Sequence, residues 1–121
     1  MTNVTIADNW TYFNNSFGAG IFIDGIQPPY FPGSKIVNSI VWGNGEATFF
    51  DEYVNNGTPT GSIGVTYSNI EGGFEGEGNI NLDPLFVDSQ NGNFTLESES
   101  PCINTGNPNL WYNDMTGLFV C

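Results

Sequence analysis

Basic side chains are almost missing from this sequence of 121 residues. It contains one lysine, Lys35, and neither arginine nor histidine, whereas thirteen residues are acidic, so the formal net charge is −12. Lys and Arg supply the sequence-independent part of nucleic-acid affinity and the attraction to anionic lipid headgroups. The composition therefore argues against nucleic acid and membranes as partners. Metal cations and neutral polymers remain, as does the simpler role of keeping the protein soluble.

Long apolar segments and helical periodicity are missing as well. No apolar run approaches the roughly 20 residues that cross a bilayer. No window places apolar residues at the 3.6-residue period of a helix. We therefore expect no membrane insertion and almost no helix.

Cysteine is scarce, with Cys102 and Cys121 alone, both near the end of the chain. A bridge between them would fasten the last segment and stabilise the fold by about 3 kcal/mol. The alternative is two reduced thiols, as in a cytosolic protein. The two positions alone do not decide between these states.

Short runs of β-branched and aromatic residues are present, and Asn-Gly pairs and other turn signals separate them. They predict strands near residues 3–6, 20–23, 35–41, 47–50 and 63–70. The residues expected inside are Val4, Ile6, Ile21, Ile23, Ile36, Ile40, Ile63, Val65 and Ile70. A shift of one residue in the register of residues 38–44 would place Val41 inside instead of Ile40.

A repeat underlies these runs, because "NVTIADN" at residues 3–9 is echoed by "NSIVWGN" at residues 38–44. A third, weaker copy, "VTYSNIEGG", begins at residue 65, and matching Ile40 with Ile70 places it 30 positions further on. Repeats of this length indicate coils of short, stacked parallel strands rather than a sandwich. Aligned asparagines, Asn3 with Asn38 and Asn9 with Asn44, would then form amide ladders at the turns.

The pattern changes after residue 74, where three prolines interrupt the rhythm. Proline ends a strand or confines it to an edge, and a stacked repeat needs an atypical last unit to cover its open end. We therefore assign residues 1–74 to coils and residues 75–121 to a C-terminal capping segment of the same domain.

Several fragments in this order resemble the C-terminal part of secreted bacterial proteins of the pectin-lyase-like superfamily. The fragments are "NSIVWGN", "VTYSNIEGG", "GNINLDPLFVD", "NGNFTL" and "SPCINTGNP". The resemblance implies an all-β fold, a short right-handed single-stranded parallel β-helix with an irregular C-terminal cap. It also implies an extracellular or cell-surface location, which favours the bridge between Cys102 and Cys121 over reduced thiols.

Catalysis is not favoured by the residues present. Lyases of this superfamily use calcium and an arginine or lysine base, and Lys35 is the one candidate in this chain. A glycosidase needs two carboxyl groups, but the neighbours Asp51 and Glu52 would point to opposite faces of a strand. The aspartate-rich motifs of the superfamily's pectin hydrolases are not recognisable. The residues leave the question of an enzyme open and favour a non-catalytic protein, with the fragment of a polysaccharide-degrading glycosidase or lyase as an alternative.

Carboxylates and aromatic residues define two candidate binding sites. Glu71, Glu75 and Glu77 lie among glycines in "EGGFEGEGN", a composition that suits calcium, although a solvated turn explains it equally simply. No cofactor is required, and calcium is the ion these carboxylates would accept. Aromatic rings pack on the apolar faces of sugars. The expected sugar-binding residues are Trp10, Tyr12, Trp42 and Tyr30, which alternatively pack in the core or cover loops.

We interpret the chain as a non-catalytic extracellular module that binds polysaccharide or associates with a cell surface. A self-assembling structural protein is the alternative from another class. We expect this alternative because no recognisable capping segment precedes the first coil. An uncovered strand edge templates pairing with another chain, so we expect self-association there as a dimer or filament.

Overall fold

The computed structural model describes residues 1–10, 20–23, 34–45, 49–51, 54–55, 58–59 and 63–109. In this part of the chain the fold is all-β, and its single helical element is a three-residue 3-10 turn, η1 (Ser89–Asn91). The described residues contain no helix long and apolar enough to cross a membrane. The strands are β1 (Thr5–Ala7), β2 (Ile21–Ile23), β3 (Lys35–Val37), β4 (Ile40–Trp42), β5 (Phe49–Asp51), β6 (Val54–Asn55), β7 (Thr58–Pro59), β8 (Gly64–Thr66), β9 (Asn69–Ile70), β10 (Phe86–Asp88) and β11 (Asn93–Leu96).

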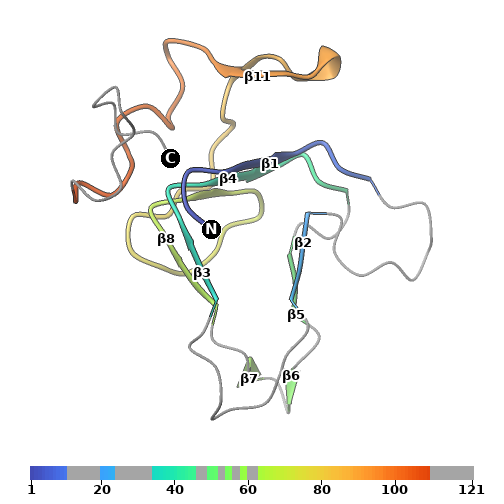
Figure 1. Cartoon of the computed structure of the whole chain (residues 1–121), viewed down its shortest axis with the longest axis vertical. Coiled ribbons are helices and arrows are strands. Elements are labelled where there is room, and N and C mark those ends of the chain that lie inside the picture. The colour runs from blue at the N-terminus through green and yellow to red at the C-terminus, as the bar shows by residue number, and fades with distance from the viewer. Residues whose placement is uncertain are drawn as a thin grey trace.

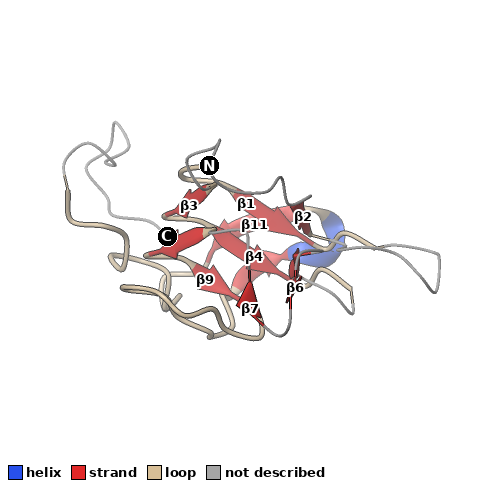
Figure 2. Ribbon diagram, turned by 90° about the horizontal axis from the view of Figure 1, so that it is seen from below, coloured by secondary structure: helices blue, strands red, loops and turns tan. Residues whose placement is uncertain are grey.

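The repeated segments pair in parallel, as the repeat predicts. Strands β1, β4 and β9 form one sheet in that order, and Figure 2 shows them as successive strands. Ile6 pairs with Val41, and Val41 pairs with Ile70. The first offset is 35 residues, as expected. The second is 29 rather than 30, so the predicted match of Ile40 with Ile70 is wrong by one residue.

Two further parallel pairs lie beside this sheet. Strand β3 pairs with β8, and β2 pairs with β5. In Figure 1 the β1/β4, β3/β8 and β2/β5 pairs form three sides around a common interior. Parallel pairing requires a long return path between partners, and the chain supplies it by passing along the other sides.

The predicted strands 35–41 and 63–70 are each divided in two. Asn38 and Tyr67 have positive φ angles of 51° and 50°, and they separate β3 from β4 and β8 from β9. Left-handed backbone cannot continue a strand, and Asn adopts it more readily than other side chains do. Asn3, with φ of 55°, makes the same bend before β1. The apolar runs therefore bend at Asn38 and Tyr67 instead of forming one long strand each.

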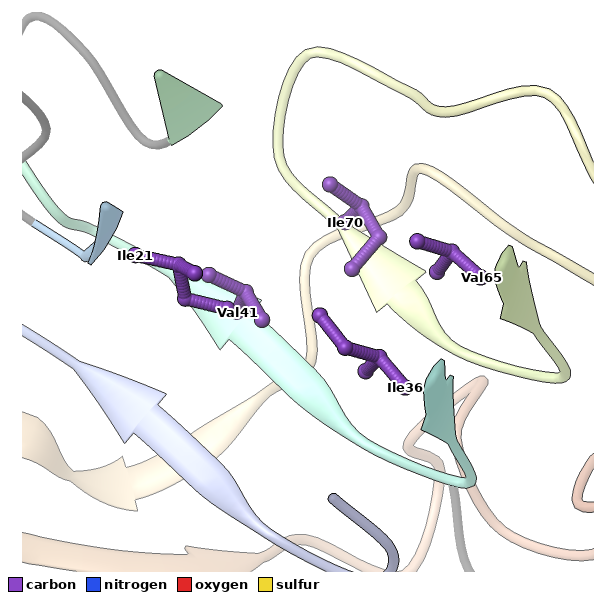
Figure 3. Close-up of a cluster of buried hydrophobic side chains, with 5 residues drawn as sticks. All are labelled: Ile21, Ile36, Val41, Val65 and Ile70. Atoms are coloured by element: carbon purple, nitrogen blue, oxygen red, sulfur yellow. The ribbon is translucent and has the colours of Figure 1, made fainter. Parts of the chain in front are cut away.

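The inner core is the buried cluster of Ile21, Ile36, Val41, Val65 and Ile70. Figure 3 shows these side chains converging from neighbouring strands. Fully burying a Val or Ile side chain contributes about 1.5–3 kcal/mol. The expected inner residues Ile6 and Ile63 are half-buried and pack against the cluster, and Val4 is half-buried too. The side chain of Ile23 lies outside the described residues.

A second cluster, the outer core, lies on the opposite face of the β1–β4–β9 sheet. It consists of buried Ile40 and Cys102, with half-buried Trp42, Ile80, Phe86 and Leu96 packed against them. The antiparallel pair β10–β11 supplies Phe86 and Leu96. Because both faces of the sheet are covered, Ile40 and its neighbour Val41 are 3% and 0% exposed. Val41 points into the inner core and Ile40 points into the outer core, so both are buried on different faces of the sheet.

Candidate functional site

Serine and asparagine side chains form a hydrogen-bond ladder across the bends that precede β1, β4 and β9. The Val4 N–H donates to Ser39 Oγ (3.4 Å), the Ser39 N–H donates to Ser68 Oγ (3.1 Å), and the Ser68 N–H donates to Asn79 Oδ1 (3.0 Å). Each serine hydroxyl also donates to the carbonyl two residues earlier in its own chain segment. Ser39 and Ser68 are buried, so the ladder satisfies backbone groups that water does not reach.

A second set of side-chain hydrogen bonds lies at the other end of these strands, in the turns after β1 and β4. Asn44 Oδ1 accepts from both the backbone N–H and the side-chain amide of Asn9, at 3.1 and 2.8 Å. The Asn44 amide in turn donates to the Ile6 carbonyl (2.8 Å). The predicted contact of Asn9 with Asn44 is therefore confirmed, and its role here is structural. Gly43 in this turn has φ of 68°, which favours glycine.

The other predicted pair, Asn3 and Asn38, occupies equivalent bends before the paired strands β1 and β4. Asn38 is buried, and its Oδ1 accepts a hydrogen bond from the Asn107 N–H (2.8 Å). This bond ties the C-terminal segment to the corner between β3 and β4. Asn38 thus serves the packing of the chain on itself.

The carboxylates proposed for calcium have separate hydrogen-bond partners. Glu71 Oε2 accepts from the Gly43 N–H (2.8 Å), and Glu77 Oε1 accepts from the Tyr67 hydroxyl (2.7 Å). Glu75 is exposed. Among the described residues, no group of three or more His, Cys, Asp or Glu side chains is arranged to hold a metal, so these three glutamates are not gathered into one site.

Tyr67 and Glu77 form the one described interaction that perturbs a titratable group. The hydrogen bond from the Tyr67 hydroxyl to the Glu77 carboxylate raises the pKa of Tyr67 above its ordinary value of 10.0, and partial desolvation and the negative charge of Glu77 act in the same direction. The Tyr67 ring lies against Gly78, where a side chain would collide with it. This arrangement stabilises the turn and does not indicate an acid–base role.

The four candidate sugar-binding aromatics differ in their environments. Trp10 follows β1 and is 72% exposed. Trp42, at the end of β4, is half-buried and packs against the outer core. Tyr12 and Tyr30 lie outside the described residues. Of the two candidate tryptophans, Trp10 alone presents most of its surface to solvent.

Of the two cysteines, Cys102 lies within the described residues. Cys102 is buried in the outer core, and its Sγ accepts a hydrogen bond from Asn69 Nδ2 (3.1 Å). Cys121 lies outside the described residues, so the predicted bridge stays a prediction. Asn69 also exchanges two bonds with the Leu82 backbone, at 2.7 and 3.2 Å. This buried amide joins the sheet to the segment that covers it.

Sequence reasoning missed Ser39, Ser68, Asn69 and Asn79, which carry much of the buried polar structure. A signal was present, because Ser39 and Ser68 are 29 residues apart, which is the observed offset of the coils. The assumed offset of 30 obscured this alignment.

Comparisons with models of known protein families, with curated proteins and with solved structures found no match.

Proposed function

We propose that this chain is a non-catalytic, extracellular binding module built as a short right-handed parallel β-helix, with polysaccharide as its ligand. Three observations support the architecture: parallel pairing at offsets of 35 and 29 residues, left-handed bends at equivalent positions, and side-chain hydrogen bonds at both ends of the β1 and β4 strands. Parallel strands that stack coil upon coil, with a covering C-terminal segment, are what a solenoid requires.

The observation that carries the binding role is the exposure of Trp10. At 72% exposure, the indole of Trp10 offers a large, flat apolar face to a ligand. Sugar rings stack on such faces through their C–H groups, while neighbouring amides bond the hydroxyls. Asn9 directly precedes Trp10 and is exposed as well.

A non-catalytic role agrees with the state of the described carboxylates. Glu71 and Glu77 are engaged by a backbone N–H and by a tyrosine hydroxyl within the fold. We propose that calcium is not required for binding, and that these glutamates act on the structure of the turns.

The test is a polysaccharide pull-down and glycan array with the intact protein, with and without EDTA. Trp10→Ala should abolish binding and leave the far-UV circular dichroism unchanged. Val87→Ala, which trims another exposed apolar residue, should bind like the wild type. Trp42→Ala is expected to lower stability because Trp42 packs on the outer core. Undiminished binding by Trp10→Ala would overturn the proposal, and loss of binding in EDTA would assign calcium a role.

A further inference from the structure

The two edges of the β1–β4–β9 sheet differ. Beyond β9, the segment from Glu77 to Ile80 continues the parallel pairing: Tyr67 N–H donates to the Glu77 carbonyl (2.8 Å), and Ile80 exchanges bonds with the Ser68 carbonyl and the Ile70 N–H (2.9 and 3.0 Å). Strand β1 is the other edge. Within the described part of the chain, no strand pairs with its outer side.

The backbone groups that β1 presents outward can be identified. Ile40 N–H donates to the Val4 carbonyl (2.9 Å), and Asp8 N–H donates to the Trp42 carbonyl (3.2 Å), so the even-numbered residues face β4. Alternate residues of a strand direct their N–H and C=O groups to alternate sides. Thr5 and Ala7 therefore face outward. The Ala7 carbonyl accepts a hydrogen bond from Asn9 Nδ2 (3.2 Å) and keeps a second lone pair for a partner strand.

The side chains of the edge also indicate an incomplete stack. Val41 and Ile70 pair on neighbouring strands and point into the inner core, where they are 0% and 1% exposed. Ile6 holds the same position in β1 and is only half-buried. An added strand would therefore cover apolar surface and satisfy backbone groups together.

We propose that β1 pairs antiparallel with β1 of a second copy of the chain, around a two-fold axis at Ile6. Thr5 of one copy would then exchange backbone hydrogen bonds with Ala7 of the other, and the two Ile6 side chains would face each other. Such an interface uses the same surface twice and closes at the dimer. The paired outer side of β9 leaves no matching edge there for head-to-tail growth, so the dimer is favoured over a filament.

Charge supports the antiparallel arrangement. Asp8 lies at the end of β1, whereas Lys35 lies near its start, since Thr2 bridges Val37 in the adjacent coil. Antiparallel pairing about Ile6 places Asp8 opposite Val4 of the second copy and directs it toward the end that holds Lys35. Parallel pairing of two β1 strands would instead set the Asp8 carboxylates side by side, which is unfavourable. A three-residue edge covers less than the roughly 1,200 Å² of a standard interface, so the dimer is weak and depends on concentration.

The register provides the test. In the proposed dimer, position 6 meets itself as a non-hydrogen-bonded pair with Cα atoms about 4.5 Å apart, within reach of a disulfide. Under mild oxidation at high protein concentration, Ile6→Cys should form a crosslinked dimer on a non-reducing gel. Val4→Cys is the matched control, because position 4 faces Asp8, and it should crosslink no more than the wild type. Equal crosslinking of both variants, or of neither, would overturn the proposal.

A second pair of variants tests the hydrogen bonds. Thr5→Pro removes an outward N–H and leaves the bonds of Val4 and Asp8 to β4, so sedimentation equilibrium should show a monomer with unchanged circular dichroism. Thr5→Val should keep the concentration-dependent dimer of the wild type. A wild type that stays monomeric at its highest soluble concentration would contradict the proposal. If Thr5→Pro unfolds while the wild type is monomeric, the outer edge is used within the chain. These outcomes do not depend on polysaccharide binding.

Discussion

At the scale of single residues, the bends of the chain decide where polar side chains are needed. Among the described residues, six that are not glycine have positive φ, and four of these are Asn or Asp, the types that tolerate this backbone. The two exceptions are Tyr67 and Leu85. Each bend turns backbone groups away from regular pairing, and side chains such as Ser39 and Ser68 satisfy them. Side-chain hydrogen bonds at the bends therefore help to determine the path of the chain, as strand pairing does.

Removing the Ser68 hydroxyl should destabilise the fold measurably. Ser68→Ala leaves the buried Ser39 N–H without its acceptor, and an unsatisfied buried polar group costs about 1–3 kcal/mol. Ser98→Ala is the control, because Ser98 is exposed. Urea denaturation compares the free energies of unfolding. Equal stability of the two variants would show that the ladder carries little energy.

The Tyr67–Glu77 pair predicts a pH effect. Folding raises the pKa of Tyr67, so the contribution of this bond to stability is present below the ordinary pKa of 10.0 and is lost as the pH rises through the folded value. Absorbance at 295 nm, taken as wild type minus Tyr67→Phe, should report a pKa above 10.0. Glu77→Gln should lower that pKa toward the ordinary value. An unchanged titration in Glu77→Gln would contradict the assignment.

At the scale of elements, the repeat predicted the parallel pairing but not its details. The echo of "NVTIADN" in "NSIVWGN" established the first offset, because identical asparagines mark equivalent turns. At the third coil the corner residue is Tyr67, which carries no turn signal, and the match was placed one residue late. The break at Tyr67 was missed for the same reason. The break at Asn38 was missed although asparagine favours such a bend, because apolar residues stand on both sides of it.

The second face of the sheet could not be predicted from local pattern. Alternation predicts one buried face, whereas burial of Ile40 depends on Cys102, Phe86 and Leu96, which are distant in sequence. Asn69 belongs to the same unpredicted layer, since a buried asparagine is recognisable only from its partners.

Asn69 should prove essential for attaching the covering segment. Asn69→Ala deprives the Leu82 backbone of both its bonds to the side chain, and we expect a loss of about 1–3 kcal/mol in the free energy of unfolding. Asn91→Ala, which changes an exposed asparagine, serves as the control in the same urea titration. A loss no larger than that of the control would show that the outer core alone holds the segment.

At the scale of the whole molecule, one sheet separates two apolar clusters, and the C-terminal part closes one face and one edge. Small domains bury a modest share of their surface, so covalent fastening of the tail would add usefully to stability. This gives the predicted Cys102–Cys121 bridge a physical purpose.

The bridge predicts an intact mass two hydrogens below the reduced form, and no alkylation in denaturant without reductant. Its closure should stabilise the tail by about 3 kcal/mol. Mass spectrometry under non-reducing conditions measures this directly. Alkylation of both cysteines would refute the bridge and weaken the case for an extracellular location.

The stacking of parallel coils at these offsets is the central claim, and methyl NOE spectroscopy on Ile- and Val-labelled protein tests it most directly. Parallel stacking predicts cross-peaks between Ile6 and Val41 and between Val41 and Ile70, which pair on neighbouring strands. Ile40 should instead contact the outer core. Cross-peaks joining Ile40 to Ile70, without those from Val41, would restore the 30-residue register and exclude this stacking.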